Sequence, residues 1–75
     1  MITLDTIPIG QSVCVVAFDL KATLLHKLLA IGITPGVIIT PMRVAPLGDP
    51  IQVKLRGTLI SLRKNECQQI QVKII

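Results

Sequence analysis

The side chains that could support catalysis are few in this sequence and lie far apart. There is one histidine, His26, and there are two cysteines, Cys14 and Cys67. A nucleophilic pair would need His26 beside a thiol, but His26 falls in a helical pattern and Cys14 in a strand expected to be covered. No GxxxxGK[ST] phosphate-binding loop occurs. We therefore predict no catalytic residue, no bound cofactor and no enzyme activity.

Metal binding would need a cluster of His, Cys or carboxylate ligands at helical or tight-turn spacing. The acidic residues Asp5, Asp19, Asp49 and Glu66 show no such spacing with one another or with His26. The two cysteines are typical of small buried hydrophobic residues that stay reduced. We predict no metal site, and a solvated position on a helix for His26.

The charged residues are mainly basic, with eight Lys and Arg against four Asp and Glu and a net charge of +4. They are scattered along the chain as Lys21, Lys27, Arg43, Lys54, Arg56, Arg63, Lys64 and Lys73. Small nucleic-acid-binding proteins usually add aromatic residues for base stacking, but Phe18 is the only aromatic residue here. Nucleic acid is therefore not the expected partner. A solvated surface, an acidic protein or an anionic membrane surface stays open.

The elements that position these side chains are those of one small domain covering residues 1–75. Hydrophobic residues make up 51% of the chain and are nearly all aliphatic, which favours strands. A helix over 20–31 is inserted after the first long strand, which is apolar on both faces and is expected to be central. The expected strands cover 12–18, 37–44, 51–56, 59–62 and 69–75, and residues 63–67 are expected to make one tight helical turn. In the last strand Ile70, Val72 and Ile74 should point inward.

Caps and turns separate these elements. Asp19 is a good N-cap for the helix, and Gly32 ends it in the left-handed conformation. Pro35 and Gly36 stand where a type II turn needs them. Pro41 indicates a bulge or an edge position in the second strand. A mainly β fold follows, a small barrel of about five strands with short connections.

No apolar run approaches the roughly 20 residues that a membrane-spanning helix needs. The N-terminus has no basic region before an apolar run, so no signal peptide is visible. We expect a cytoplasmic protein.

Three stretches resemble the FeoA family of bacterial ferrous iron uptake: AIGITPG, the Gly48-Asp49-Pro50 loop and GTLISLR. The opening TLDTIPIGQSV is similar to that family's start, so the resemblance covers essentially the whole chain. It implies an SH3-like β-barrel and partnership with FeoB, a membrane transporter with a cytoplasmic GTPase region. An SH3-like barrel that binds proline-rich peptides would need aromatic side chains, so that binding mode is excluded.

Two arrangements are candidate surfaces for partner binding or self-association. The apolar arc of the helix is wider than one barrel can cover, which leaves Leu25 and Leu29 at its open edge and Leu24 and Leu28 buried. The second is the basic face of strand 51–56, with Lys54 and Arg56. In both cases a purely structural role stays open, as completion of the core or as a solvated face. An arginine reaching a GTPase's phosphate site has no support in the spacing.

The function predicted from these observations is that of a non-catalytic accessory protein of ferrous iron uptake that binds FeoB. Two alternatives stay open. One is a free-standing barrel that binds nucleic acid. The other is a metal-responsive module like the C-terminal domain of iron-dependent repressors.

Overall fold

The structure is a computed structural model that describes residues 2–19 and 22–75, without the side chains of residues 22–24. The elements follow the predicted order, with short differences at their ends and one short 3-10 helix that was not predicted. They are η1 (Leu4–Thr6), β1 (Val13–Phe18), α1 (Ala22–Ala30), β2 (Ile38–Val44), β3 (Ile51–Leu55), β4 (Thr58–Leu62), α2 (Lys64–Cys67) and β5 (Ile70–Ile74).

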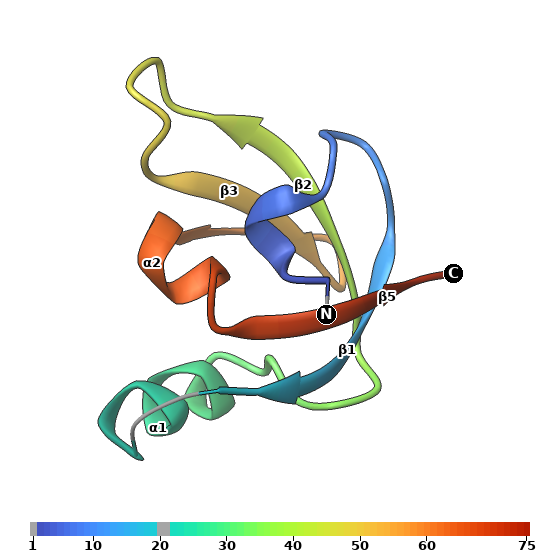
Figure 1. Ribbon diagram of the computed structural model, residues 1–75, viewed down its shortest axis with the longest axis vertical. Coiled ribbons are helices and arrows are strands. Elements are labelled where there is room, and N and C mark those ends of the chain that lie inside the picture. The colour runs from blue at the N-terminus through green and yellow to red at the C-terminus, as the bar shows by residue number, and fades with distance from the viewer. Residues whose placement is uncertain (1, 20–21) are drawn as a thin grey trace.

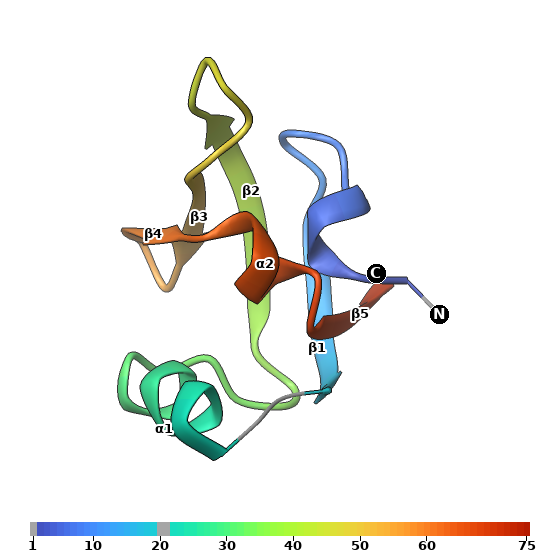
Figure 2. The same cartoon turned by 60° about the vertical axis from the view of Figure 1, so that its left-hand side comes forward.

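The strands form one antiparallel sheet in the order β4-β3-β2-β1-β5, which bends around the core (Figures 1 and 2). Strand β1 lies between β2 and β5, as its two apolar faces predicted. The N-terminal segment pairs with β5 through a bridge between Thr3 and Gln71. The backbone N–H of Val72 also donates to the carbonyl of Ile2 at 2.9 Å. The chain therefore begins and ends side by side.

The core is aliphatic and comes from alternate residues of the strands, as expected for a sheet with one buried face. Its fully enclosed side chains include Val13, Ile39, Val53, Leu62 and Ile70. Leu4 of η1 and Leu28 of α1 also pack into it. Each such side chain contributes about 1.5–3 kcal/mol by leaving water. Phe18 is only half-buried against this cluster.

The end of α1 is fixed by Gly32, whose φ of +95° lies in the region that favours glycine. The N–H of Gly32 donates to the carbonyl of Leu29, and that of Ile33 to the carbonyl of Leu28. These two bonds are those of a Schellman motif. Its hydrophobic contact is supplied by Leu28 and Ile33, both fully buried.

The connection from α1 to β2 is the predicted type II turn. Gly36 has a φ of +94°, and the N–H of Val37 donates to the carbonyl of Thr34 at 3.1 Å. Further along β2, the register with β3 shifts between Pro41 and Arg43, so Pro41 marks a bulge, one of the two predicted positions. It is not at an edge, because β2 lies between β1 and β3.

Two predictions about strand residues were wrong. Arg56 is not the last residue of the third strand but the first residue of the β3–β4 turn, with a φ of +51°. Ile74 is not part of the core, since it is 51% exposed although its partner in β1, Val13, is fully buried. Ile74 pairs with Val13, the first residue of β1, and lies past the point where the N-terminal segment pairs with β5.

The predicted N-cap role of Asp19 is not tested, because residues 20 and 21 lie outside the described part of the chain. The backbone N–H of Asp19 donates to the carbonyl of Gln69 at 2.8 Å.

Candidate interaction surfaces

The residues considered for catalysis lie on separate elements. His26 is exposed on α1, Cys14 is half-buried in β1, and Cys67 is fully buried at the end of α2. Within residues 2–19 and 22–75, no group of three His, Cys, Asp or Glu side chains is placed to hold a metal ion. Burial, with the nearby charges of Asp5, Glu66 and Asp49, raises the pKa of the Cys67 thiol to about 12. A thiol in that state is neither a nucleophile nor a metal ligand at neutral pH.

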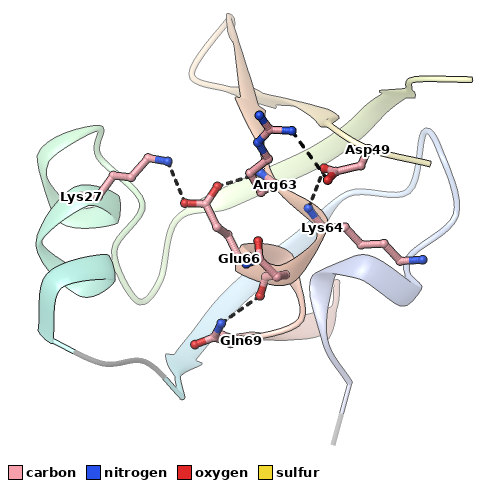
Figure 3. Close-up of polar contacts among 7 residues, drawn as sticks. Lys27, Asp49, Arg63, Lys64, Glu66 and Gln69 are labelled. Atoms are coloured by element: carbon pink, nitrogen blue, oxygen red, sulfur yellow. Dashed lines mark hydrogen bonds and ion pairs between the residues drawn. The ribbon is translucent and has the colours of Figure 1, made fainter. Parts of the chain in front are cut away.

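Polar contacts that the sequence did not predict join α1 to α2 (Figure 3). The Lys27 ammonium lies 2.7 Å from Oε2 of Glu66, whose side chain is 5% exposed. The other carboxylate oxygen of Glu66 accepts the backbone N–H of Arg63 at 2.7 Å. Burial alone would raise the pKa of Glu66, but these two hydrogen bonds outweigh it and hold the pKa below its ordinary value. Glu66 is therefore a charged anchor between the two helices.

The loop before β3 is tied to the same helix. A carboxylate oxygen of Asp49 accepts the backbone N–H of Lys64 at 2.9 Å, at the start of α2. The second oxygen lies 3.7 Å from the guanidinium of Arg63 (Figure 3). A carboxylate in this place satisfies a free donor of the helix terminus. The Gly48-Asp49-Pro50 loop thus has a structural explanation.

The helix surface is consistent with the predicted pattern. Leu28 is fully buried, whereas Leu29 is 43% exposed and Leu25 is half-buried. Ile31, just past the helix, is 37% exposed. The side chain of Leu24 lies outside what the structure describes. Leu25 and Leu29 are named here the helix ridge.

The basic residues of the third strand belong to a second surface. Lys54 is exposed and pairs with Thr40 on one side and Leu59 on the other. Arg56 also reaches this surface, although from the β3–β4 turn. The two basic side chains line a shallow, open hollow of about 550 Å³ with Val37, Ile38, Thr40 and Gly57. We name this hollow the sheet groove. Sequence reasoning missed Ile38, which alternates with the buried Ile39 and so had to face outward.

The C-terminal end of α1 lies near the β3–β4 turn, which holds Arg56. A Cβ atom added to Gly32, at the end of α1, would lie 3.6 Å from Cδ2 of Leu55. Leu55 directly precedes Arg56, so the C-terminal end of the helix packs beside the β3–β4 turn. Figure 2 shows α1 below that turn. The residue that ends α1 is therefore close to the turn that holds Arg56.

Comparison with known proteins identifies the family. A sequence model of the FeoA domain matches residues 2–74, nearly the whole chain. The chain belongs to the FeoA domain family. FeoA domains are non-catalytic, as predicted for this sequence. In the described part of the chain, no helix has the length and apolar character to cross a bilayer.

Two solved structures agree with this fold over almost the whole chain. The FeoA-like protein of Clostridium acetobutylicum is 35% identical, with a TM-score of 0.90, and the match covers 99% of this chain and 86% of that one. FeoA of Stenotrophomonas maltophilia, a procaryotic SH3 domain protein complexed with zinc, is 26% identical with a TM-score of 0.83. That match covers 97% of this chain and 91% of the other. The predicted SH3-like fold, with a helix after the first long strand, is thereby confirmed.

A longer relative joins two proteins in one chain. It is the Fe(2+) transport protein A/Fe(2+) transporter FeoB fusion protein of Porphyromonas gingivalis, 27% identical over 66 residues. These residues are 88% of this chain but only 8% of that relative. The chain thus corresponds to one small domain of a much larger protein.

Proposed function

We propose that this chain is an accessory protein of ferrous iron uptake that acts in the cytoplasm by binding the soluble, GTPase-bearing region of an FeoB-type transporter. The observation that carries the proposal is the Porphyromonas gingivalis fusion, in which an FeoA segment and an FeoB transporter share one chain. Domains fused in one protein are held at a high effective concentration, which favours contacts between them. Here the same contact would form between separate chains.

The helix ridge and the sheet groove supply the contact surface of this proposal. Leu25 and Leu29 lie one helical turn apart and form a single apolar strip on α1. Aliphatic side chains buried in a partner contribute most of the affinity of such a contact, while charges at its rim orient the encounter. Lys54 and Arg56 have that second role.

The test is direct binding between this chain and the purified soluble region of an FeoB protein from the same organism, measured by calorimetry. We expect a saturable one-to-one complex that Leu29→Ala weakens by about tenfold, as for a moderate interface anchor. The matched control is Leu47→Ala, since Leu47 is 97% exposed in the loop before β3. It should leave the affinity unchanged. Absence of a complex with the wild-type chain would refute the proposal.

Two further assays address the alternatives that the sequence left open. Anaerobic titration with Fe(II) should give no stoichiometric site of micromolar affinity, because no ligand cluster exists in the described residues. Retention on a nucleic-acid column should be weak, because dispersed basic residues can contact few phosphates at once. Each phosphate contact contributes about 0.9 to the slope of log affinity against log salt concentration, so that slope should be small. A tight metal site would favour the metal-responsive module. Strong retention would favour the nucleic-acid-binding barrel.

A further inference from the structure

The outward face of the sheet has an apolar centre with a basic residue at each end. By register, Cys14 of β1 lies opposite Lys73 of β5 and opposite Ile38 of β2. Ile39 lies opposite Leu55, so Ile38 stands beside Arg56. One row across the sheet therefore reads Lys73, Cys14, Ile38 and Arg56. Lys54 and Thr40 form part of the next row.

No strand residue neutralises these charges. The five strands contain Arg43, Lys54 and Lys73 but no Asp or Glu. Two of the chain's four acidic residues are engaged elsewhere, Glu66 with Lys27 and Asp49 with Arg63. The strands of this face thus carry basic side chains without an acidic one among them, which favours an anionic partner.

Arg56 has an unusual backbone conformation for its residue type. With φ values of +51° and +81°, Arg56 and Gly57 form a two-residue turn of the kind in which Asn-Gly is preferred. A non-glycine residue without a short polar side chain is disfavoured there. Arginine at this position therefore lowers the stability of the turn, and what it provides in return is a charge at the end of the sheet groove.

The shape of the sheet groove indicates the size of what it accommodates. The groove is open and shallow, and its floor includes Ile38, which is 45% exposed. One aliphatic side chain seated on Ile38 would have Lys54 and Arg56 on the same side. Carboxylates next to that aliphatic residue in the bound segment would then meet the two basic groups.

We propose that the sheet groove binds an extended acidic segment of a partner protein, with one aliphatic residue between carboxylates. The aliphatic residue packs on Ile38, and the carboxylates pair with Lys54, Arg56 and, at the far end of the row, Lys73. This inference deepens the proposed function, and rests on it only for the identity of the protein that supplies the segment. A nucleic acid fits less well, because the groove offers no aromatic side chain for stacking and its centre is apolar.

The experiment uses the full chain and a synthetic capped peptide, acetyl-Ser-Asp-Glu-Leu-Asp-Glu-Ser-amide, followed by ¹⁵N NMR titration at low salt. We expect saturable binding with shifts centred on the amides of Ile38, Thr40, Lys54 and Arg56. Two control peptides, one with Leu replaced by Ser and one with the acids replaced by their amides, should bind more weakly. The variant Arg56→Asn should raise Kd by about fivefold, the effect of losing one exposed ion pair.

Arg56→Asn also separates binding from folding. Because asparagine tolerates a positive φ, the variant should keep or raise the melting temperature while it loses affinity. The matched control is Lys64→Gln, which removes one exposed positive charge on α2, outside the groove, and should leave Kd unchanged. Equal losses in both variants would overturn the proposal, because only net charge would then matter. Absence of peptide binding would also overturn it, as would equal affinity for the peptide without leucine. In a parallel titration with phosphatidylglycerol vesicles, binding to the vesicles but not to the peptide would overturn it as well.

These outcomes are distinguishable from failure of the proposed function. Peptide binding without binding of the FeoB soluble region would support the groove as a peptide-binding site and refute the transporter as the protein that supplies the segment. Binding of the FeoB region that Arg56→Asn leaves unchanged would keep the transporter as partner and refute the groove.

Discussion

Glu66 links α1 to the start of α2 through one carboxylate. One oxygen contacts Lys27 of α1, and the other accepts the N–H that opens α2. Because the side chain is almost completely buried, its charge is tolerated only while both contacts exist. The lowered pKa of Glu66 shows that the contacts with Lys27 and Arg63 stabilise its charged form in the folded protein.

This arrangement predicts a pH dependence of stability. A carboxyl whose pKa is lower in the folded protein stabilises the fold above its unfolded pKa, and the stabilisation is lost as pH falls through the folded pKa. For Glu66 the loss should begin near pH 4.5, its ordinary pKa, and continue below it. Glu66→Gln should cost about 1–3 kcal/mol at pH 7 and flatten the acid limb of the unfolding curve. Urea unfolding at several pH values would show this, and an unchanged acid limb in the variant would contradict it.

Cys67 gives a second prediction for a single residue. Its thiol is fully buried and its pKa is raised to about 12, so almost no thiolate forms at neutral pH. Iodoacetamide at pH 8 should leave Cys67 unmodified in the folded protein and label it fully in urea. Peptide mass spectrometry would identify the labelled cysteine. Labelling of Cys67 at its unfolded rate in buffer would mean that the end of α2 opens readily.

At the scale of one helix, the neighbours Leu28 and Leu29 provide a matched pair. Leu28 is fully buried, so Leu28→Ala should destabilise the fold by about 2–5 kcal/mol. Leu29 is 43% exposed, and Leu29→Ala should cost well under that, about 1 kcal/mol or less. Thermal unfolding of both variants checks the difference. Similar losses would place Leu29 in the core and remove the helix ridge as a binding surface.

Strand β3 provides a second pair of neighbours with opposite orientations. Val53 is fully enclosed, and Val53→Asp should prevent folding because it buries an unpaired charge. Lys54 is exposed, and Lys54→Asp should cost at most about 1 kcal/mol, the span of strand propensities. Circular dichroism of the two purified variants would compare them. Equal destabilisation would contradict the register of β3.

The elements were predictable from the sequence where their signals are local. Gly32 and the Pro35–Gly36 pair act within a few residues of themselves, so the end of α1 and the turn after it were predicted correctly. Arg56 was assigned to the wrong element because the alternation of β3 continues through it. An arginine side chain also gives no signal of a positive φ. The prediction that Ile74 is buried failed because alternation predicts the face on which a residue lies. It does not predict whether another segment of the chain covers that face.

The contact between Lys27 and Glu66 illustrates what the sequence could not provide. The two residues lie on different helices, and the three strands between these helices in the sequence must bend back for the helices to meet. The same holds for the sheet groove. Ile38 and Lys54 come from strands whose pairing depends on the bulge at Pro41. Local patterns predicted the exposure of Leu29 and Lys54, and tertiary pairing decided which exposed residues share a surface.

Over the whole molecule, charge is separated between two regions. Glu66 and Asp49 lie in the α2 region and are paired with lysine or arginine there. The strands carry only basic charges. A partner with an acidic surface is therefore attracted toward the sheet, close to the exposed apolar side chains of α1. Orientation and affinity then come from different elements of the molecule.

This separation makes a kinetic prediction for the complex with the FeoB soluble region. Reversal of charge with Lys54→Glu and Arg56→Glu should slow association, because rim charges act mainly on the encounter. The effect should fade as ionic strength rises, since the screening length falls from about 10 Å at 0.1 M to about 3 Å at 1 M. Leu29→Ala should instead speed dissociation at every salt concentration, because apolar contacts in the formed complex are not screened. Surface plasmon resonance over a salt series separates the two rates. If charge reversal changed only the dissociation rate, Lys54 and Arg56 would belong to the buried centre of the contact, and the helix ridge would not be its principal anchor.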